Sequence, residues 1–275
     1  MSMTFDECLA PRDLRMMPKL ADHVMDQLQL SGRLYVITGA SGGIGRAVAE
    51  GLAEGGANVV NASRSVGPQW NEWAAKLAER CQVTVVNSQC DVTDMTQIQV
   101  LLTGIRQRFG RIDGFVANAG VAIPKPIMEQ TLDEYHTQMN VNVHGVFYCA
   151  KSIGPIFKEQ GFGNFIITGS ISGRVVTVPV DHTTYNTTKA AVIHLGRSLA
   201  REWRGFARVN IVSPGYINTA MSSCPASIHE ACRMAAMGRQ GDVKELKGVF
   251  TFLASDASSF VTGAEFTVDG GYTLT

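Results

Sequence analysis

The sequence predicts a single α/β domain built on one doubly wound parallel sheet with helices on both faces. Three observations lead to this prediction. Short runs of β-branched and other apolar residues alternate with longer segments of helical periodicity from residue 33 nearly to the C-terminus. The strand segments are continuously apolar, as in strands that helices cover on both sides. No internal repeat, low-complexity tract or long linker divides the chain.

The elements follow one another as strand–helix–strand units, which join parallel strands by right-handed crossovers. The first strand is predicted at residues 34–38, followed by a helix over 44–54 and a second strand over 57–61. The later strands are predicted at 83–86, 112–117, 164–168, 208–212 and 265–268. The remaining helical patterns cover 70–80, 95–109, 132–161, 185–203 and 243–255. We expect residues 1–29 to be an N-terminal extension and residues 30–275 to be the catalytic domain.

Composition excludes several classes of protein. The chain has 275 residues, a length that α/β folds often use for one domain. Apolar residues make up 45% and charged residues 17%, which excludes a disordered chain, a coiled coil and a collagen-like fibre. The 24 basic residues balance the 24 acidic ones, so net charge gives no reason to expect a nucleic acid or an anionic membrane as partner.

Cysteine and histidine patterns point to a cytoplasmic protein without a metal. The six cysteines form no CxxC pair and no secretory signal is evident, so we expect six reduced thiols. No stretch approaches the roughly 18 consecutive apolar residues that a membrane-spanning helix needs. The six histidines make no HExxH motif or other ligand cluster, and no metal site is predicted.

The loop after the first strand carries glycines spaced to receive a phosphate. It reads TGASGGIG over residues 38–45. Glycine lets backbone N–H groups approach a ligand closely, and the helix that starts here adds the positive end of its dipole. The spacing differs from the general GxGxxG fingerprint, so an ordinary glycine turn stays open. The residues expected to bind cofactor here are Gly39, Ser41, Gly43, Ile44 and Gly45.

The end of the second strand favours NADP(H) over NAD(H). A carboxylate at this point would bind the ribose hydroxyls and repel a 2′-phosphate, but the chain has Ser63 and Arg64. A guanidinium pairs well with phosphate, and Arg46 could add a second positive charge. The alternative is that Arg64 is a solvated loop residue.

Tyr185 and Lys189 form a candidate proton-transfer pair. Residues four apart share one face of a helix, which places Lys189 near the phenol of Tyr185. A nearby ammonium should lower the tyrosine pKa from about 10 toward the range of a general acid/base. The alternative is an ordinary amphipathic helix with a surface lysine.

Seven motifs together resemble the short-chain dehydrogenase/reductase family. They occur in the family's order over about residues 30–272. They are TGASGGIG (38–45), CDVTD (90–94), NAG (118–120), VNVHG (141–145), GSISG (169–173), YNTTK (185–189) and SPGYINT (213–219). The resemblance implies a Rossmann-type domain, a nicotinamide cofactor and a homotetramer or dimer. The expected interface segments are 132–161, 185–203 and 268–272.

The resemblance also implies a role for each catalytic residue. Tyr185 would donate a proton to the substrate carbonyl oxygen, and Ser170 would hydrogen-bond that oxygen. Lys189 would bind the nicotinamide ribose and lower the tyrosine pKa. Asn142 would hold a water that connects Lys189 to solvent.

Further positions would hold the cofactor. Asp91 would accept from the adenine amino group beside the Val92 backbone, and Ile217 and Thr219 would contact the carboxamide. The other cofactor residues implied by the family motifs are Asn118, Gly120, Tyr185, Lys189, Pro214 and Gly215.

Substrate specificity is expected from segments 121–126, 171–182 and 216–238, beyond the carboxyl edge of the sheet. Residues 170–189 are similar to the branch of fungal mannitol dehydrogenases and of sorbose and xylulose reductases, which implies reduction of a ketose to a polyol. The expected substrate contacts are Ser170, Ser172, His182, Tyr185 and Tyr216. A more apolar ketone of secondary metabolism, or an acyl-thioester, stays open. Segment 216–238 is either a mobile lid or one or two packed helices.

Two readings from other classes also stay open. One is a redox sensor that binds NADP(H) without turnover. The other is a cyclase or isomerase that uses the cofactor as a template.

Overall fold

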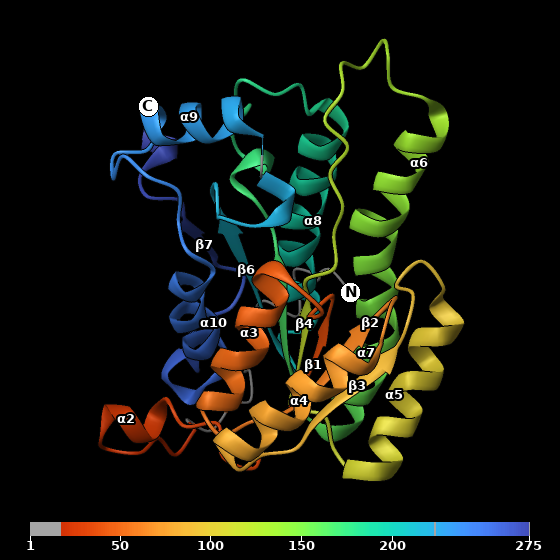
Figure 1. Cartoon of the computed structure of the whole chain (residues 1–275). Helices are drawn as coiled ribbons and strands as arrows, with labels where there is room; N and C mark the ends of the chain where they lie inside the picture. The colour runs from red at the N-terminus through yellow and green to blue at the C-terminus, as the bar shows by residue number, and fades with distance from the viewer. Residues whose placement is uncertain (1–17, 223, 275) are drawn as a thin grey trace, which may run out of the picture.

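The computed structural model describes residues 18–222 and 224–274, and their strands form one parallel sheet of seven in the order β3-β2-β1-β4-β5-β6-β7 (Figure 1). The chain runs outward from β1 to β3, returns to the far side of β1 with β4, and continues outward to β7. This is the doubly wound topology that was predicted. The strands are β1 (Leu34–Thr38), β2 (Asn58–Ser63), β3 (Val85–Gln89), β4 (Gly114–Ala117), β5 (Asn164–Thr168), β6 (Arg208–Pro214) and β7 (Glu265–Val268).

Helices cover both faces of this sheet (Figure 1). One face packs against α3 (Gly43–Glu54), α4 (Pro68–Cys81) and α10 (Lys247–Ala254). The other face packs against α5 (Met95–Phe109), α7 (Gly145–Gln160) and α8 (Thr183–Glu202). Successive residues of β1 alternate between the two cores: Tyr35 and Ile37 belong to the first, Val36 to the second. All five β1 residues are buried, which explains their continuous apolar run.

Helix boundaries have local causes. The carboxylate of Asp94 accepts from the Thr96 N–H at 2.9 Å and begins α5, which ends at Gly110 in the left-handed conformation. Thr131 and Glu134 form a reciprocal capping box at the start of α6 (Leu132–Met139).

The order and approximate positions of the strands and helices were confirmed, with differences at their ends. β3 and β4 begin two residues later than predicted, and β3 also ends three residues later. β2 and β6 each run two residues further than predicted, because Ser63 and Pro214 continue the ladder although they are not apolar pattern residues. The predicted helix over 132–161 is interrupted by a π-helical turn, η1 (Asn140–His144), between α6 and α7. Such turns occur frequently at functional sites.

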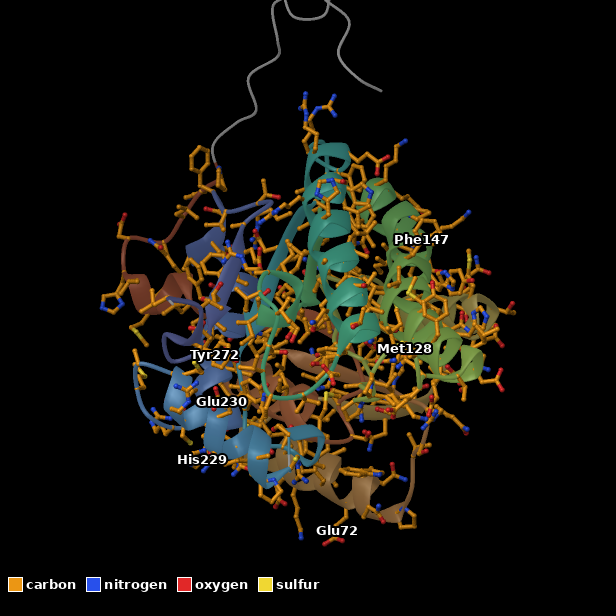
Figure 2. The ribbon with its side chains drawn as sticks, turned by 90° about the horizontal axis from the view of Figure 1, so that it is seen from above. Glu72, Met128, Phe147, His229, Glu230 and Tyr272 are labelled. Carbon is orange, nitrogen blue, oxygen red and sulfur yellow. The ribbon has the colours of Figure 1, made fainter. Side chains whose placement is uncertain are left out.

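Segment 216–238 contains helical structure. A 3₁₀ turn, η3 (Ala220–Ser222), precedes α9 (Pro225–Met234). Seen from above, α9 with His229 and Glu230 lies next to Tyr272 of the C-terminal turn η6 (Tyr272–Leu274) (Figure 2). Before the sheet, the short helix α2 (Val24–Gln27) leads to Leu30, which is fully buried in the core. The rest of the predicted N-terminal extension, residues 1–17, lies outside the described residues.

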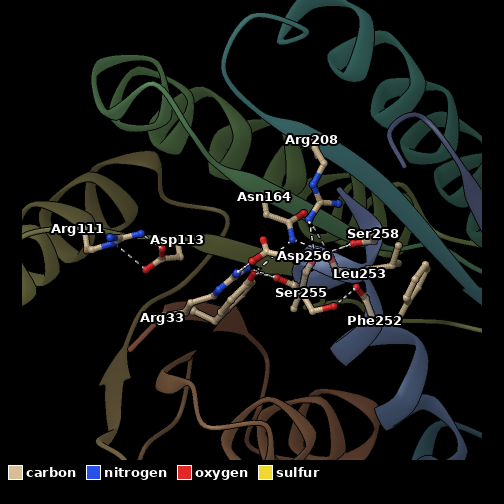
Figure 3. A network of polar contacts seen from close by, with 12 residues as sticks. Arg33, Arg111, Asp113, Asn164, Arg208, Phe252, Leu253, Ser255, Asp256 and Ser258 are labelled. Carbon is tan, nitrogen blue, oxygen red and sulfur yellow. Dashed lines mark hydrogen bonds and ion pairs between the residues drawn. The ribbon is translucent and has the colours of Figure 1, made fainter. Parts of the chain in front are cut away.

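A polar network closes the amino-terminal edge of the sheet (Figure 3). The Asn164 amide donates to the Leu253 carbonyl at 2.6 Å and to the Tyr35 hydroxyl at 3.2 Å. That hydroxyl donates to the Ala254 carbonyl at 2.6 Å, and Arg208 donates to the Leu253 carbonyl at 3.0 Å. These side chains satisfy the last carbonyls of α10, which have no partner within the helix. The network therefore fastens α10 to the starts of β1, β5 and β6.

We expect Asn164→Ala to lower the free energy of unfolding by about 1–3 kcal/mol, because two buried hydrogen bonds are lost, to the Tyr35 hydroxyl and to the Leu253 carbonyl, although Arg208 still donates to that carbonyl. Urea unfolding measures this loss. The Michaelis parameters should stay within about twofold of wild type, since Asn164 lies at the edge opposite the cavity described below. An unchanged unfolding free energy would show that the network does not fasten α10.

Candidate active site

A cavity of about 630 Å³ lies at the carboxyl edge of the sheet, where open α/β sheets bind ligands. The site residues predicted from the sequence line it, with the exception of Asn142 and Arg46. One end is formed by the glycine loop and by Arg64 after β2. The other end holds Ser170 after β5 and Tyr185 on α8. The sheet thus brings together segments that are distant in the sequence.

The glycine loop approaches β4 so closely that side chains are excluded. A Cβ on Gly45 would lie 2.4 Å from the Asn118 side-chain nitrogen and 2.5 Å from the Gly39 carbonyl oxygen. Gly39 and Gly43 adopt positive φ angles of 71° and 52°, which glycine allows at low cost. No side chain caps the start of α3, so its first N–H groups have no capping acceptor. These features suit a pyrophosphate.

Asn118 holds this loop in place. Its amide nitrogen donates to the Thr38 carbonyl at 3.0 Å, and its amide oxygen accepts from the Thr168 hydroxyl at 3.1 Å. Asn118 therefore ties β1, β4 and β5 together below the cavity that it lines.

The end of β2 separates two residues that were predicted to act together. The Ser63 hydroxyl is buried and donates to Asn61 at 2.8 Å, so its proton is already used inside the protein. Arg64 is exposed and has no ion-pair partner within residues 18–222 and 224–274. Asp91 keeps one carboxylate oxygen available, because Thr93 bonds only the other, at 2.9 and 2.8 Å.

Arg46 does not line the cavity, and the expectation that it adds a second charge there is wrong. Its guanidinium lies 5.2 Å from the centre of the Trp73 ring and bonds Glu50 at 3.4 Å. These two contacts hold the side chain along α3 and α4.

Three of the predicted catalytic side chains follow β5 or lie on α8. The Ser170 hydroxyl accepts from the Ser172 N–H at 3.1 Å, which starts the 3₁₀ turn η2 (Ile171–Gly173). Tyr185 and Lys189 lie one turn apart on α8, with the lysine Nζ 5.7 Å from the centre of the tyrosine ring. Nζ donates to the Thr168 carbonyl of β5 at 2.9 Å. Ser170, Tyr185 and Lys189 therefore meet at one end of the cavity.

Known proteins are similar to this chain in sequence and in fold. Residues 39–273 match a family model described as Enoyl-(Acyl carrier protein) reductase. An NADP-dependent mannitol dehydrogenase of Hypocrea jecorina is 42% identical over 259 residues, covering 92% of this chain and 97% of that protein. A sorbose reductase of Candida albicans is 41% identical over 261 residues, covering 93% and 92% respectively. The crystal structure of an NADPH-dependent 3-quinuclidinone reductase from Rhodotorula rubra superposes with a TM-score of 0.92 at 44% identity, covering 95% of this chain and 98% of that one.

The chain belongs to the short-chain dehydrogenase/reductase family. The resemblance seen in the motifs is thereby confirmed, including its branch.

Asn142 of this short-chain dehydrogenase/reductase lies behind the cavity wall, within the π-helical turn. Its amide oxygen accepts from the Val121 N–H at 2.8 Å, and its amide nitrogen donates to the Val121 carbonyl at 2.8 Å. The same nitrogen donates to the Thr188 hydroxyl at 3.1 Å. Its side chain therefore joins the loop after β4 to α8. The expectation that Asn142 holds a water stays a prediction.

Burial controls the protonation of the catalytic pair. Burial raises the pKa of Tyr185, and hydrogen bonding to Ser170 only partly opposes this. The predicted lowering of the tyrosine pKa by Lys189 is wrong for this structure, because the ammonium is bonded to Thr168 and burial dominates. Burial also lowers the pKa of Lys189 from 10.5 to about 8. At neutral pH the phenol is protonated and can donate.

The substrate end of the cavity combines polar and apolar side chains. His182 lies 5.6 Å from Tyr185, measured between ring centres. Burial lowers the pKa of His182, and its buried Nδ1 has no hydrogen-bond partner among the described residues. The Ser172 hydroxyl lies 3.4 Å from that of Thr177. Tyr216 lines the cavity, but its hydroxyl donates to the Val178 carbonyl at 2.9 Å.

Several cavity residues were not predicted individually. They follow β2, β5 and β6 at the carboxyl edge, and this position is the signal that could have found them. They are Ser65, Thr177, Ala220, Met221, Ser222 and Cys224.

Two further observations concern metal ions and membranes. Within the described part of the chain, no group of three or more His, Cys, Asp or Glu side chains could hold a metal ion. None of the helices described is both long and apolar enough to cross a membrane.

We expect Lys189→Met to abolish activity and to raise the free energy of unfolding at pH 7 by about 1–3 kcal/mol. A lysine pKa lowered from 10.5 to about 8 means that burying the charge costs roughly 3 kcal/mol below pH 8. Loss of the donor to the Thr168 carbonyl offsets part of the gain. Between pH 8 and 10.5 the gain should shrink, because native Lys189 is then neutral while the unfolded lysine is still charged.

Urea unfolding at pH 7 and pH 10 measures this effect. Lys158→Met serves as the control, because Lys158 is exposed near the end of α7. The buried charge would be contradicted if Lys189→Met were no more stable than wild type at pH 7. It would also be contradicted if the gain in unfolding free energy were the same at pH 7 and pH 10.

Proposed function

We propose that this protein is an NADPH-dependent carbonyl reductase that reduces a ketose to a polyol and catalyses the reverse oxidation. The observation that carries the proposal is the convergence of Ser170, Tyr185 and Lys189 at one end of a cavity whose other end holds the glycine loop and Arg64. The named activities of the mannitol dehydrogenase and the sorbose reductase support the same function.

The residues present fit an NADP(H) molecule. The start of α3, which no side chain caps, offers N–H groups to a pyrophosphate, and Arg64 is available for a 2′-phosphate. A Cβ on Gly120 would lie 3.4 Å from Asn142 Oδ1 and 3.7 Å from Lys189 Nζ, so glycine keeps the space beside the lysine open. Thr219 and Ile217 line the same cavity between its two ends. When bound, the nicotinamide supplies the hydride.

The chain's own residues handle the proton and the charge on oxygen. The buried Tyr185 hydroxyl donates a proton to the carbonyl oxygen of the ketone, and the Ser170 hydroxyl hydrogen-bonds the same oxygen. Lys189 lies within reach of the tyrosine and provides positive charge below its pKa of about 8. In the oxidation direction the phenolate accepts the proton, so that direction gains from higher pH.

A hydroxylated ketone matches the substrate end best. His182 carries a buried nitrogen without a partner, and Ser172 and Thr177 add hydroxyl groups nearby. A neutral imidazole can both donate to and accept from substrate hydroxyls. Val180 and Met221 form the apolar part of the same wall and suit the carbon skeleton. The complete catalytic set favours turnover over a sensor or a template role.

We extend the proposal to a cytoplasmic homotetramer or dimer. Large apolar side chains are exposed on the helices of the predicted interface, among them Leu132 on α6 and Phe147 on α7, which points outward (Figure 2). Phe260, close before β7, is also fully exposed. Contact between subunits would cover these side chains.

We expect the purified protein to oxidise NADPH in the presence of sorbose or xylulose, and Tyr185→Phe to lower kcat by about 10²–10⁴-fold because the proton donor is lost. Absorbance at 340 nm measures both. Tyr148→Phe is the matched control, because Tyr148 packs beside Phe147 on α7 and away from the cavity. If the protein reduced acyl-thioesters but neither ketoses nor 3-quinuclidinone, the proposed substrate class would be wrong. Tight NADPH binding without any turnover would favour the sensor.

We expect Arg64→Asp to weaken NADPH binding by about 10–100-fold and to change NADH binding by less than about threefold, because only NADPH carries the 2′-phosphate. Quenching of protein fluorescence gives both dissociation constants. Arg46→Gln should leave the ratio unchanged, since that guanidinium is held by Trp73 and Glu50. Equal weakening of both cofactors by Arg64→Asp would show that Arg64 does not bind the phosphate.

A further inference from the structure

Residues 174–182 form an irregular wall of the substrate end, here called the substrate wall. The segment connects the turn that follows Ser170 to the start of α8, which carries Tyr185. Thr177, Val180 and His182 of this wall line the cavity. Because it has no regular secondary structure, its backbone groups need partners from elsewhere.

Two tyrosine hydroxyl groups bond the backbone of one residue in the substrate wall. The Val178 N–H donates to the Tyr272 hydroxyl at 3.2 Å, and the Tyr216 hydroxyl donates to the Val178 carbonyl at 2.9 Å. The two rings are 5.5 Å apart, measured between their centres. Tyr216 follows β6, and Tyr272 begins the C-terminal turn η6. Both polar backbone groups of Val178 are therefore hydrogen-bonded to tyrosine hydroxyls.

Both tyrosines are themselves fixed. Tyr272 is buried together with Ile171 and Ala235 in a small separate core, against which Tyr216 packs. The C-terminal turn around it is closed by Asp269, whose carboxylate accepts from the Gly271 N–H at 2.9 Å and from the Thr273 N–H at 2.8 Å. The two hydroxyls thus extend from a packed base toward the substrate wall.

The substrate wall is also held on either side of Val178. The Asp181 carbonyl accepts from the Lys125 N–H at 2.9 Å, and the Thr177 hydroxyl lies 3.4 Å from that of Ser172. Val178 is the point at which the C-terminal turn and the loop after β6 reach this segment. A shift at Val178 would move Thr177 and Val180 directly and His182 through the intervening backbone.

We propose that Tyr216 and Tyr272 are positioning residues for the substrate: acting through Val178, they hold the substrate wall at the distance from Tyr185 that a ketose requires. This assignment replaces the expected direct contact of Tyr216 with substrate, since the proton of its hydroxyl is used on Val178. The kinetic part of the inference depends on the proposed function, and the structural part does not.

Hydrogen–deuterium exchange of the full-length protein with NADPH tests the structural part. Tyr272→Phe removes the acceptor for the Val178 N–H, and exchange in peptides covering 174–182 should become about three- to tenfold faster. Tyr216→Phe should produce a smaller increase in the same peptides, since the N–H bond remains. Tyr148→Phe, the control, should change nothing there. Unchanged exchange in Tyr272→Phe would overturn the proposal.

Steady-state kinetics tests the positioning role. Each variant should raise KM for sorbose or xylulose by about three- to tenfold, with kcat, the NADPH dissociation constant and the melting temperature near wild type. The double variant should show less than the product of the two single effects, because both hydroxyls act on one residue.

The kinetic outcomes separate the two proposals. A wild-type KM in both variants, or a loss in kcat alone, would overturn the positioning role. If the wild-type protein turned over no ketone, the proposed function would fail, and the exchange result would still decide whether the tyrosines hold Val178.

Discussion

The buried ammonium of Lys189 is the contact on which the catalytic end of the molecule depends. By donating to the Thr168 carbonyl it joins α8 to the end of β5, two residues before Ser170. Tyr185 lies one turn before Lys189 on the same helix, so the contact also helps to hold Tyr185 near Ser170. A charge placed there is costly, since burial alone brings the pKa of Lys189 down to about 8. Burying this charge lowers the stability of the fold, and the benefit we propose for it is catalytic. Such a loss of stability is typical of functional sites.

Around this contact, polar side chains at the carboxyl edge serve mainly to hold backbone in place. Asn118 joins three strands below the glycine loop, and Asn142 joins the loop after β4 to α8. Both amides are bonded to groups of the protein itself, which holds the backbone around this part of the cavity in place. The substrate wall is held in another way, by tyrosine hydroxyls that reach it from the C-terminal turn and the loop after β6. The cofactor end and the substrate end therefore depend on separate sets of contacts.

Most of the fold could be predicted from the sequence because the central strands are covered on both sides and so read as apolar runs. The predictions were less accurate where polar residues continue a strand, as Ser63 does in β2. The π-helical turn at Asn142 was not predicted, because the pattern over 132–161 was read as one continuous helix and a single extra residue shifts it by only one position. Spacing correctly placed Tyr185 and Lys189 on one face of a helix. It could not show that the ammonium turns to β5, because that partner lies 21 residues away in the sequence.

The same limit applies to contacts between distant segments. Arg46 and Arg64 looked equally available in the sequence, and only the packing of α4 against α3 brings Trp73 to Arg46. The bonds from Tyr216 and Tyr272 to Val178 span 38 and 94 residues, and no motif connects them.

The network of Asn164, Arg208 and Tyr35 lies at the edge of the sheet opposite the cavity, and this separation has a consequence for how the protein can change. The residues that fasten α10 lie at the amino edge of the sheet, and those proposed to contact a ketone lie at the carboxyl edge. Loops at the carboxyl edge can therefore vary in sequence without weakening the network that stabilises the fold. Such a fold can acquire new substrate preferences through substitutions in the loops at the carboxyl edge alone. Divergence of the substrate in this lineage is then expected to outpace divergence of the architecture.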